Sequence, residues 1–149
     1  MKNIISALLL TAMLTLSAPA GAAERLDDQA IRTLVVGKTL LGQYPSGVRW
    51  RETFFVDEET DYQDPEYRLR GTWYAQDDAL CTFYEDATDF EGSCFITIKR
   101  SDNCVDFYAI GSDGEPVSAS QSDMALGVNW TARGWRSDQN STCPQGLTS

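Results

Sequence analysis

Few residues of this 149-residue sequence could carry out catalysis, because the chain contains no histidine. A Ser-His or Cys-His nucleophile pair and an HExxH zinc site are therefore excluded. Paired carboxylates such as Asp86 and Asp89 fall in a turn-like segment, where solvated acids are the ordinary interpretation. We predict no catalytic residue, no metal site and no cofactor, and we expect that the protein is not an enzyme.

The number of cysteines indicates whether the chain forms disulfide bonds. The four cysteines are Cys81, Cys94, Cys104 and Cys143. An even count in a short exported chain predicts two disulfide bonds formed in an oxidising compartment. Spacing alone allows three pairings. In the hairpin registers that we expect, Cys81 and Cys94 meet on the inner face and Cys104 points outward, which favours Cys81–Cys94 and Cys104–Cys143.

A carboxylate among aromatic residues is the second chemical feature. Folding WRETFFV against YRLRGTW about an acidic loop at 57–66 sets Trp50 opposite Trp73. Glu52 then faces Gly71, and a buried carboxylate needs an arginine, a water cluster or a polar ligand as its partner. This predicts an interior ligand site formed by Trp50, Glu52, Phe54, Tyr67 and Trp73. The plainer alternative is that Glu52 lies near a barrel mouth and stays hydrated.

The opposite face of the same two segments carries Arg49, Arg51, Arg68 and Arg70. Guanidinium groups bind carboxylates and phosphates, so these four residues form a candidate anion-binding stripe. The alternative is a solvated sheet face whose arginines pair with acidic neighbours.

The pattern of apolar residues predicts the helix and the strands that position these side chains. ERLDDQAIRTLVVGKT predicts a short amphipathic helix, capped by Asp27 and ended by Gly37. The strand-like segments after it are KTLLGQY, VRWRETFFV, YRLRGTWYA, LCTFYE, CFITIK, CVDFYAI and MALGVNWTAR. We predict a mainly β fold, with a short N-terminal helix before a seven- or eight-stranded antiparallel barrel or strongly curled sheet with two disulfides. A two-sheet sandwich stays open as an alternative.

Two further hairpin registers place apolar residues on a single face. A three-residue turn at Asp77–Ala79 brings Phe83 opposite Trp73. A hairpin tip at RSDN pairs Ile98 with Val105.

The first 23 residues have the pattern of a signal peptide. Lys2 precedes the apolar run IISALLLTAML and the small-residue stretch SAPAGAA, which predicts cleavage near Ala22 or Ala23. The domain organisation is therefore a signal peptide at 1–23 and a single β-rich domain at 24–149. We expect a periplasmic or secreted product without membrane insertion after cleavage, because the apolar run is too short to span a bilayer well.

The charge limits the partners that we expect. The chain carries 12 basic and 22 acidic residues, a net charge of −10. Nucleic acid and anionic membranes are therefore poor partners, whereas a small molecule or a cationic protein stays possible as a partner.

The stretch Gly71-Thr72-Trp73-Tyr74 resembles the Gly-x-Trp signature of the calycins, the lipocalin and avidin-like barrels. The resemblance implies a tryptophan packed across a barrel end near the first strand. Over more of the chain, the order of Gly37-Lys38-Thr39, Gly71, Trp73, Leu80-Cys81 and Cys94 is similar to that of small exported alphaproteobacterial proteins in families of unknown function.

Three functional hypotheses follow. The first is a small barrel that binds a small, partly apolar molecule in its interior. The second is a protein-interaction module, such as an inhibitor of a cationic cell-wall enzyme like lysozyme, since such inhibitors are similar in being small, exported, disulfide-bonded and built on antiparallel sheet. The third is an envelope-associated structural protein. An interior cavity beside Glu52 favours the first hypothesis, and a filled barrel favours the second.

Overall fold

The computed structural model describes residues 23–85 and 92–144. Their elements in chain order are β1 (Glu24–Arg25), α1 (Asp28–Val35), β2 (Lys38–Gln43), β3 (Arg49–Phe54), β4 (Glu59–Gln63), β5 (Arg68–Gln76), β6 (Ala79–Tyr84), β7 (Gly92–Ser101), β8 (Cys104–Ile110), α2 (Gln121–Leu126) and β9 (Ala132–Arg136). The predicted signal peptide, apart from Ala23, lies outside the described residues, as do Asp86 and Asp89.

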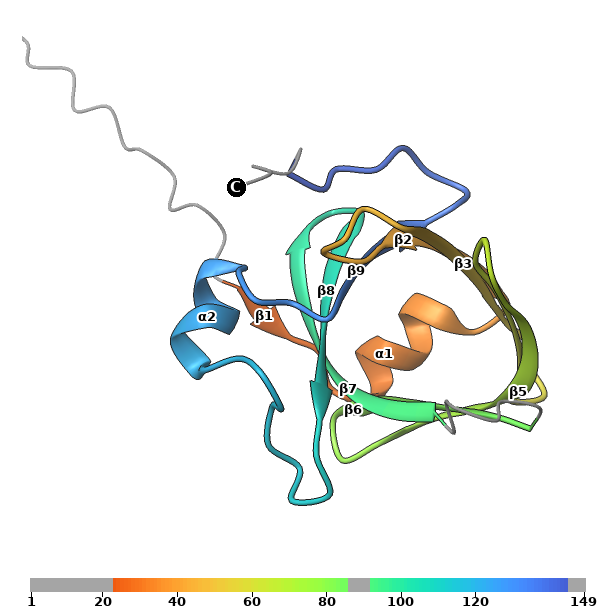
Figure 1. Cartoon of the computed structure of the whole chain (residues 1–149), viewed down its shortest axis with the longest axis horizontal. Coiled ribbons are helices and arrows are strands. Elements are labelled where there is room, and N and C mark those ends of the chain that lie inside the picture. The colour runs from red at the N-terminus through yellow and green to blue at the C-terminus, as the bar shows by residue number, and fades with distance from the viewer. Residues whose placement is uncertain (1–22, 86–91, 145–149) are drawn as a thin grey trace, which may run out of the picture.

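Strands β2 to β9 form a closed antiparallel barrel in which each strand pairs with the next along the chain. β9 pairs in turn with β2, from Leu40–Arg136 to Gln43–Arg133, and this pairing closes the ring. β1 lies outside the ring as a partner of β7. Figure 1 looks along the barrel, with α1 seen inside the ring of strands. The fold is mainly β as predicted, and a closed barrel forms in place of a sandwich.

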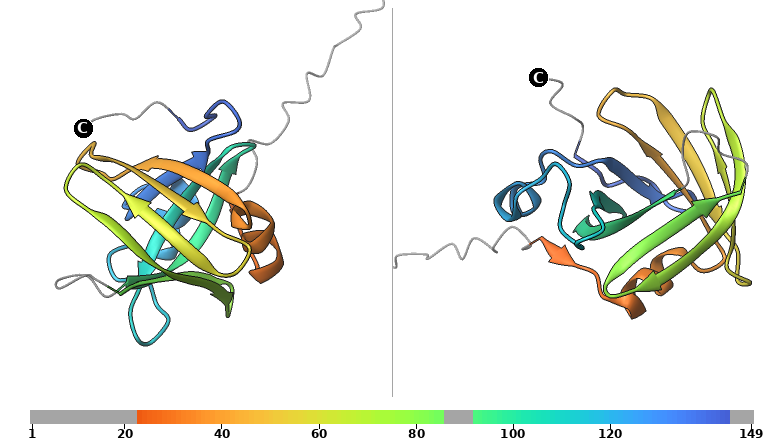
Figure 2. Two further views of the ribbon diagram at one scale, coloured as in Figure 1. Left: turned by 90° about the vertical axis from the view of Figure 1, so that its right-hand side faces the viewer. Right: turned by 60° about the horizontal axis from the view of Figure 1, so that its bottom comes forward.

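Helix α1 covers one end of the barrel (Figure 2). It begins after Asp27, whose carboxylate accepts a hydrogen bond from the backbone N–H of Ala30 at 2.8 Å. Ile31 and Val35 are fully buried, and the helix contacts β2, β5 and β6. A helix of eight residues is too short to be stable alone, so its apolar face depends on the barrel end.

Helix α2 lies against the outside of the barrel wall (Figure 1). A buried ion cluster holds it there. The carboxylate of Asp106 on β8 accepts hydrogen bonds from Nε of Arg133 at 2.6 Å and from Nε of Arg100 at 2.5 Å. Arg100 also donates to the carbonyl oxygens of Met124 and Ala125 in α2. Since a buried carboxylate needs charged partners, this cluster fixes the β8–β9 connection to the wall.

The predicted acidic loop at 57–66 is wrong, because its middle forms strand β4 between β3 and β5. Trp50 therefore does not lie opposite Trp73. Thr60 and Tyr62 of β4 are buried, while Asp61 points to the outer face. Acidic residues are depleted in strands, so the composition of this segment concealed a short alternating strand.

The predicted turn at Asp77–Ala79 is also wrong, because the turn has only two central residues, Asp77 and Asp78. Both have positive φ, 55° and 57°, which a two-residue hairpin turn of this kind requires. The carboxylate of Asp28 accepts a hydrogen bond from the N–H of Asp78 at 2.9 Å and supports the turn. As a result Thr82 lies opposite Trp73, and Phe83 points outward.

The predicted pairing of Ile98 with Val105 is shifted by one residue. Ile98 lies opposite Asp106, because a bulge between Lys99 and Ser101 changes the register of the β7–β8 hairpin. The extra residue is Arg100, whose side chain reaches Asp106 on the outer face. The predicted strand MALGVNWTAR is wrong in its first part, which forms α2.

The two predicted disulfide pairings are confirmed. Cys81 is bonded to Cys94 and Cys104 to Cys143, with Cα atoms 3.9 Å and 4.8 Å apart. The predicted inner face for the first bond is wrong: Thr82 points into the barrel, so the neighbouring Cys81 and its partner lie on the outer face. Two disulfides are typical of an oxidising compartment. Within residues 23–85 and 92–144, no helix is long and apolar enough to cross a membrane.

Candidate ligand cavity

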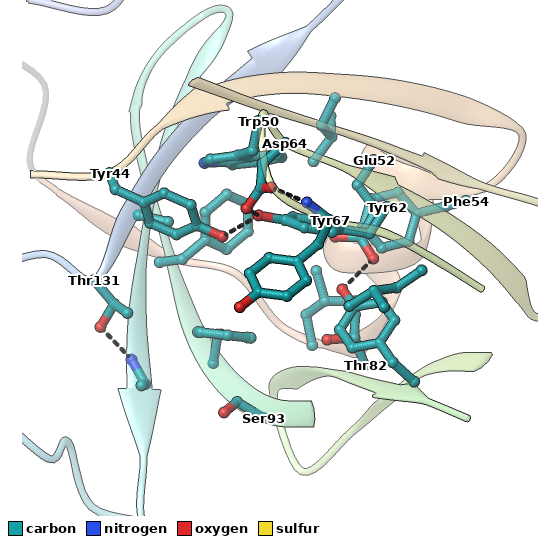
Figure 3. Close-up of a pocket in the computed structure, with 18 residues that line it drawn as sticks. Tyr44, Trp50, Glu52, Phe54, Tyr62, Asp64, Tyr67, Thr82, Ser93 and Thr131 are labelled. Carbon is teal, nitrogen blue, oxygen red and sulfur yellow. Dashed lines mark hydrogen bonds between the residues drawn. The ribbon is translucent and has the colours of Figure 1, made fainter. Parts of the chain in front are cut away.

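The barrel encloses a cavity of about 460 Å³ above α1. Its wall is largely aromatic and includes Trp50, Phe54, Phe95 and Phe107 (Figure 3). It reaches solvent at the end away from α1, where Tyr67 lines the cavity and is 53 % exposed. A volume of this size is within the range of sites for small organic molecules, about 300–1,000 Å³.

The cavity exists because several inward positions carry small residues. Gly42 and Gly134 are paired on β2 and β9, and the indole of Trp50 lies against both. A Cβ atom at Gly42 would overlap the indole ring. Ser93 and Ala132 also line the cavity with short side chains. An eight-stranded barrel is just wide enough for side chains to fill. The two glycines therefore let the indole of Trp50 lie close to the wall, and the short side chains of Ser93 and Ala132 leave part of the interior open.

Glu52 on β3 is the buried acid of the cavity, with 7 % of its surface exposed. Its Oε1 atom accepts hydrogen bonds from the hydroxyl of Thr60 at 2.9 Å and from the hydroxyl of Tyr84 at 2.7 Å. The predicted position of Glu52 opposite Gly71 is wrong, because Glu52 pairs with Tyr62 on β4. Gly71 lies between Thr60 and Tyr84 in the sheet, where a Cβ atom would overlap the backbone of Phe83.

The environment of Glu52 favours the neutral acid. Burial raises the pKa of Glu52 from 4.5 to about 7, although the hydrogen bonds from Tyr84 and Thr60 limit the rise. Burial and the nearby carboxylate of Glu52 also raise the pKa of the Tyr84 hydroxyl, which therefore remains a donor. The cavity thus contains an acid that changes charge close to neutral pH.

A second polar group lies nearer the mouth. The hydroxyls of Tyr44 and Tyr62 are 2.8 Å apart, and Tyr62 donates to Oδ2 of Asp64 at 2.8 Å. The other oxygen of Asp64 accepts from the N–H groups of Glu66 and Tyr67 (Figure 3). Burial raises the pKa of both tyrosines, and hydrogen bonding to Asp64 raises that of Tyr62 further. The acidic segment after β4 therefore holds Tyr67 at the cavity entrance.

Four of the five predicted ligand residues line the cavity, namely Trp50, Glu52, Phe54 and Tyr67. Trp73 is not among its lining residues. It lies at the end covered by α1, 1 % exposed, and its Nε1–H donates to the carbonyl oxygen of Phe55 at 3.0 Å. Its ring packs edge-on against Phe54 at 5.9 Å between centroids. Trp73 thus packs across a barrel end, although on the fourth strand of the barrel rather than the first.

Three tyrosines and one acid that face the cavity, Tyr44, Tyr62, Tyr84 and Asp64, were not among the predicted site residues. Tyr62 and Asp64 belong to the segment interpreted as a solvated loop. Alternation of Thr60 and Tyr62 between acidic residues was the signal for an inward face there.

The four arginines of the predicted anion-binding stripe lie on the outer face and are exposed. They do not form a continuous stripe, because β4 separates Arg49 and Arg51 from Arg68 and Arg70. Asp61 on β4 forms an ion pair with Arg68 at 3.5 Å, and the guanidinium of Arg49 lies 6.0 Å from the ring centre of Trp135. This arrangement matches the alternative interpretation, a solvated face with acidic neighbours.

No protein-family model matches the chain, and no curated protein shows significant similarity to it. The fold and the cavity alone therefore define the class of protein: a small, disulfide-bonded antiparallel barrel whose aromatic interior cavity contains the buried carboxylate of Glu52.

Proposed function

We propose that this protein is an exported barrel that binds a small, partly apolar molecule in its interior. The cavity of about 460 Å³ beside Glu52 is the observation that supports this proposal most strongly. In a purely structural barrel, inward side chains would fill this volume, because unfilled space costs stability.

The wall also has the composition of a binding site. Aromatic rings supply apolar contact area, and a few polar groups, Glu52, Tyr44 and Asp64 among them, can fix the orientation of a guest. Export is supported by the leader-like sequence at 1–23 and by the two disulfides.

Native mass spectrometry of the protein purified from its own compartment, without refolding, tests the proposal. We expect a reproducible adduct of a few hundred daltons, of the size that such cavities hold. The Ala132→Phe variant places a ring in the cavity and should lose the adduct, because Ala132 is part of its wall. Val117→Phe places the same ring at a position that is 70 % exposed and should retain the adduct. An apo protein that co-purifies with a cationic protein would overturn the proposal.

A further inference from the structure

We propose that the ligand of this cavity is a cationic amine with an apolar, ring-sized body, and that its ammonium group binds Glu52. The inference rests on the proposed function and specifies the chemical class of its ligand. It follows from the charge of the cavity wall, from the Oε2 atom of Glu52, to which no described side chain donates, and from the rings around it.

The charge of the wall favours a cation. Glu52 and Asp64 are acidic, and none of the described lining residues is lysine or arginine. The guanidinium of Arg32 lies over Trp73, at the end covered by α1. A bound carboxylate or phosphate would therefore meet two acids without a compensating cation, whereas an ammonium would gain from both.

The hydrogen bonding of Glu52 leaves a place for a donor. The hydroxyls of Thr60 and Tyr84 both donate to Oε1, and no described side chain donates to Oε2. An ammonium carries three donor hydrogens and no acceptor, so it matches a carboxylate oxygen with open acceptor positions.

The rings beside Glu52 suit both parts of such a ligand. Tyr62 and Tyr84 lie with their ring centres 5.7 Å apart. Tyr62 pairs with Glu52 across β3 and β4, and the hydroxyl of Tyr84 donates to Glu52. Aromatic faces attract cations, more strongly where water is excluded. Trp50, Phe95 and Phe107 form an edge-to-face group that can take the apolar body.

Binding of an ammonium should depend on pH through Glu52. The titratable groups that line the cavity with it are Tyr84 on β6, Tyr62 on β4, Tyr44 just after β2 and Asp64 just after β4. Burial raises the pKa of the three tyrosines, so they stay neutral at pH 8 and below. An alkylammonium such as that of lysine, with a pKa of about 10, stays charged over the same range.

The size of the pH effect follows from the pKa of Glu52. With a pKa of about 7, roughly one tenth of the free protein carries an ionised Glu52 at pH 6, and most of it does at pH 8. A cation that binds only the ionised form should therefore bind about tenfold more tightly at pH 8 than at pH 6.

The test uses three matched probes that share a phenyl ring and a two-carbon chain: 2-phenylethylamine, 2-phenylethanol and 3-phenylpropanoate. Isothermal titration calorimetry at pH 6 and pH 8 measures the dissociation constant of each. We expect the amine to bind most tightly at pH 8 and to weaken about tenfold at pH 6, the alcohol to bind less tightly, and the carboxylate to bind least.

Glu52→Gln should weaken the amine and abolish its pH dependence, while the alcohol should bind as before. Glu59→Gln makes the same chemical change at an exposed position of β4 and should alter none of these values. The wild-type pH profile tests the inference even if the Glu52→Gln variant does not fold.

The outcomes separate the two proposals. If the alcohol or the carboxylate binds as tightly as the amine at pH 8, or if the amine binds equally at both pH values, the inference about the ligand class is overturned and the proposed function stands. If none of the three probes binds at millimolar concentration, the inference about the ligand class is overturned, and the native mass spectrometry of the purified protein decides the proposed function separately.

Discussion

Replacing Glu52 with glutamine should change how the stability of the protein depends on pH. The pKa of Glu52 is about 7 in the folded protein and 4.5 when the residue is exposed, as in the unfolded chain. The folded state therefore holds the proton more tightly. Stability from this group is fully present below pH 4.5 and is lost as the pH rises through 7.

The magnitude follows from the same two values. A tenfold change in proton affinity corresponds to about 1.4 kcal/mol, so the difference between 4.5 and about 7 gives roughly 3 kcal/mol. Glutamine keeps a carbonyl oxygen that can accept from Thr60 and Tyr84 but has no proton to lose. The free energy of unfolding of wild type, relative to Glu52→Gln, should thus fall by about 3 kcal/mol between pH 4 and pH 8.

Urea denaturation of both proteins, followed by far-ultraviolet circular dichroism at pH 4, 5, 6, 7 and 8, measures this difference. Subtracting the two profiles removes the contribution of the other titrating groups. Glu59→Gln, at an exposed position, should run parallel to wild type. Parallel profiles for wild type and Glu52→Gln would refute the conclusion that Glu52 is a buried acid with a raised pKa.

Three other predictions concern the stability of the barrel. Gly71→Ala should prevent folding or lower the melting temperature severely, because its Cβ atom would overlap the carbonyl oxygen of Phe83. A melting temperature close to that of wild type would show that β5 and β6 can separate at this position. Asp106→Asn should lower the free energy of unfolding by about 3–5 kcal/mol in urea, since it leaves two buried arginines without a full counter-charge. Asp138→Asn removes a surface ion pair and should change the free energy of unfolding far less. Removing the disulfide that closes 39 residues should cost about 4 kcal/mol, against about 3 kcal/mol for the one that closes 13; equal losses would argue against the chain-entropy explanation.

The fold class and the identities of several inward residues could be predicted from the sequence. Alternation along β3 placed Trp50, Glu52 and Phe54 on one face correctly, and this face does line the cavity. The helix cap at Asp27 could also be recognised, because a side-chain acceptor before an amphipathic run is a local signal.

The registers could not be predicted, since they depend on single residues whose role is visible only in three dimensions. Asp77 and Asp78 adopt positive φ in a two-residue turn, and Asp78 is hydrogen-bonded to Asp28, fifty positions away in the sequence. Arg100 is the extra residue of the bulge in β7, and it forms an ion pair with Asp106 on β8. A one-residue change in register moves each side chain of a strand to the other face of the sheet. For this reason the predicted disulfide pairing was right, while the predicted face of the Cys81–Cys94 bond was wrong.

The location of a bound probe inside the barrel is the observation on which the functional proposal depends. Isotope-filtered nuclear Overhauser spectra of the ¹³C-labelled protein with saturating 2-phenylethylamine report which side chains lie within about 5 Å of the bound molecule. Binding in the cavity predicts contacts from the phenyl ring of the probe to Trp50, Phe95 and Phe107. Contacts confined to the outward-facing pair of Tyr74 and Phe83 would contradict it.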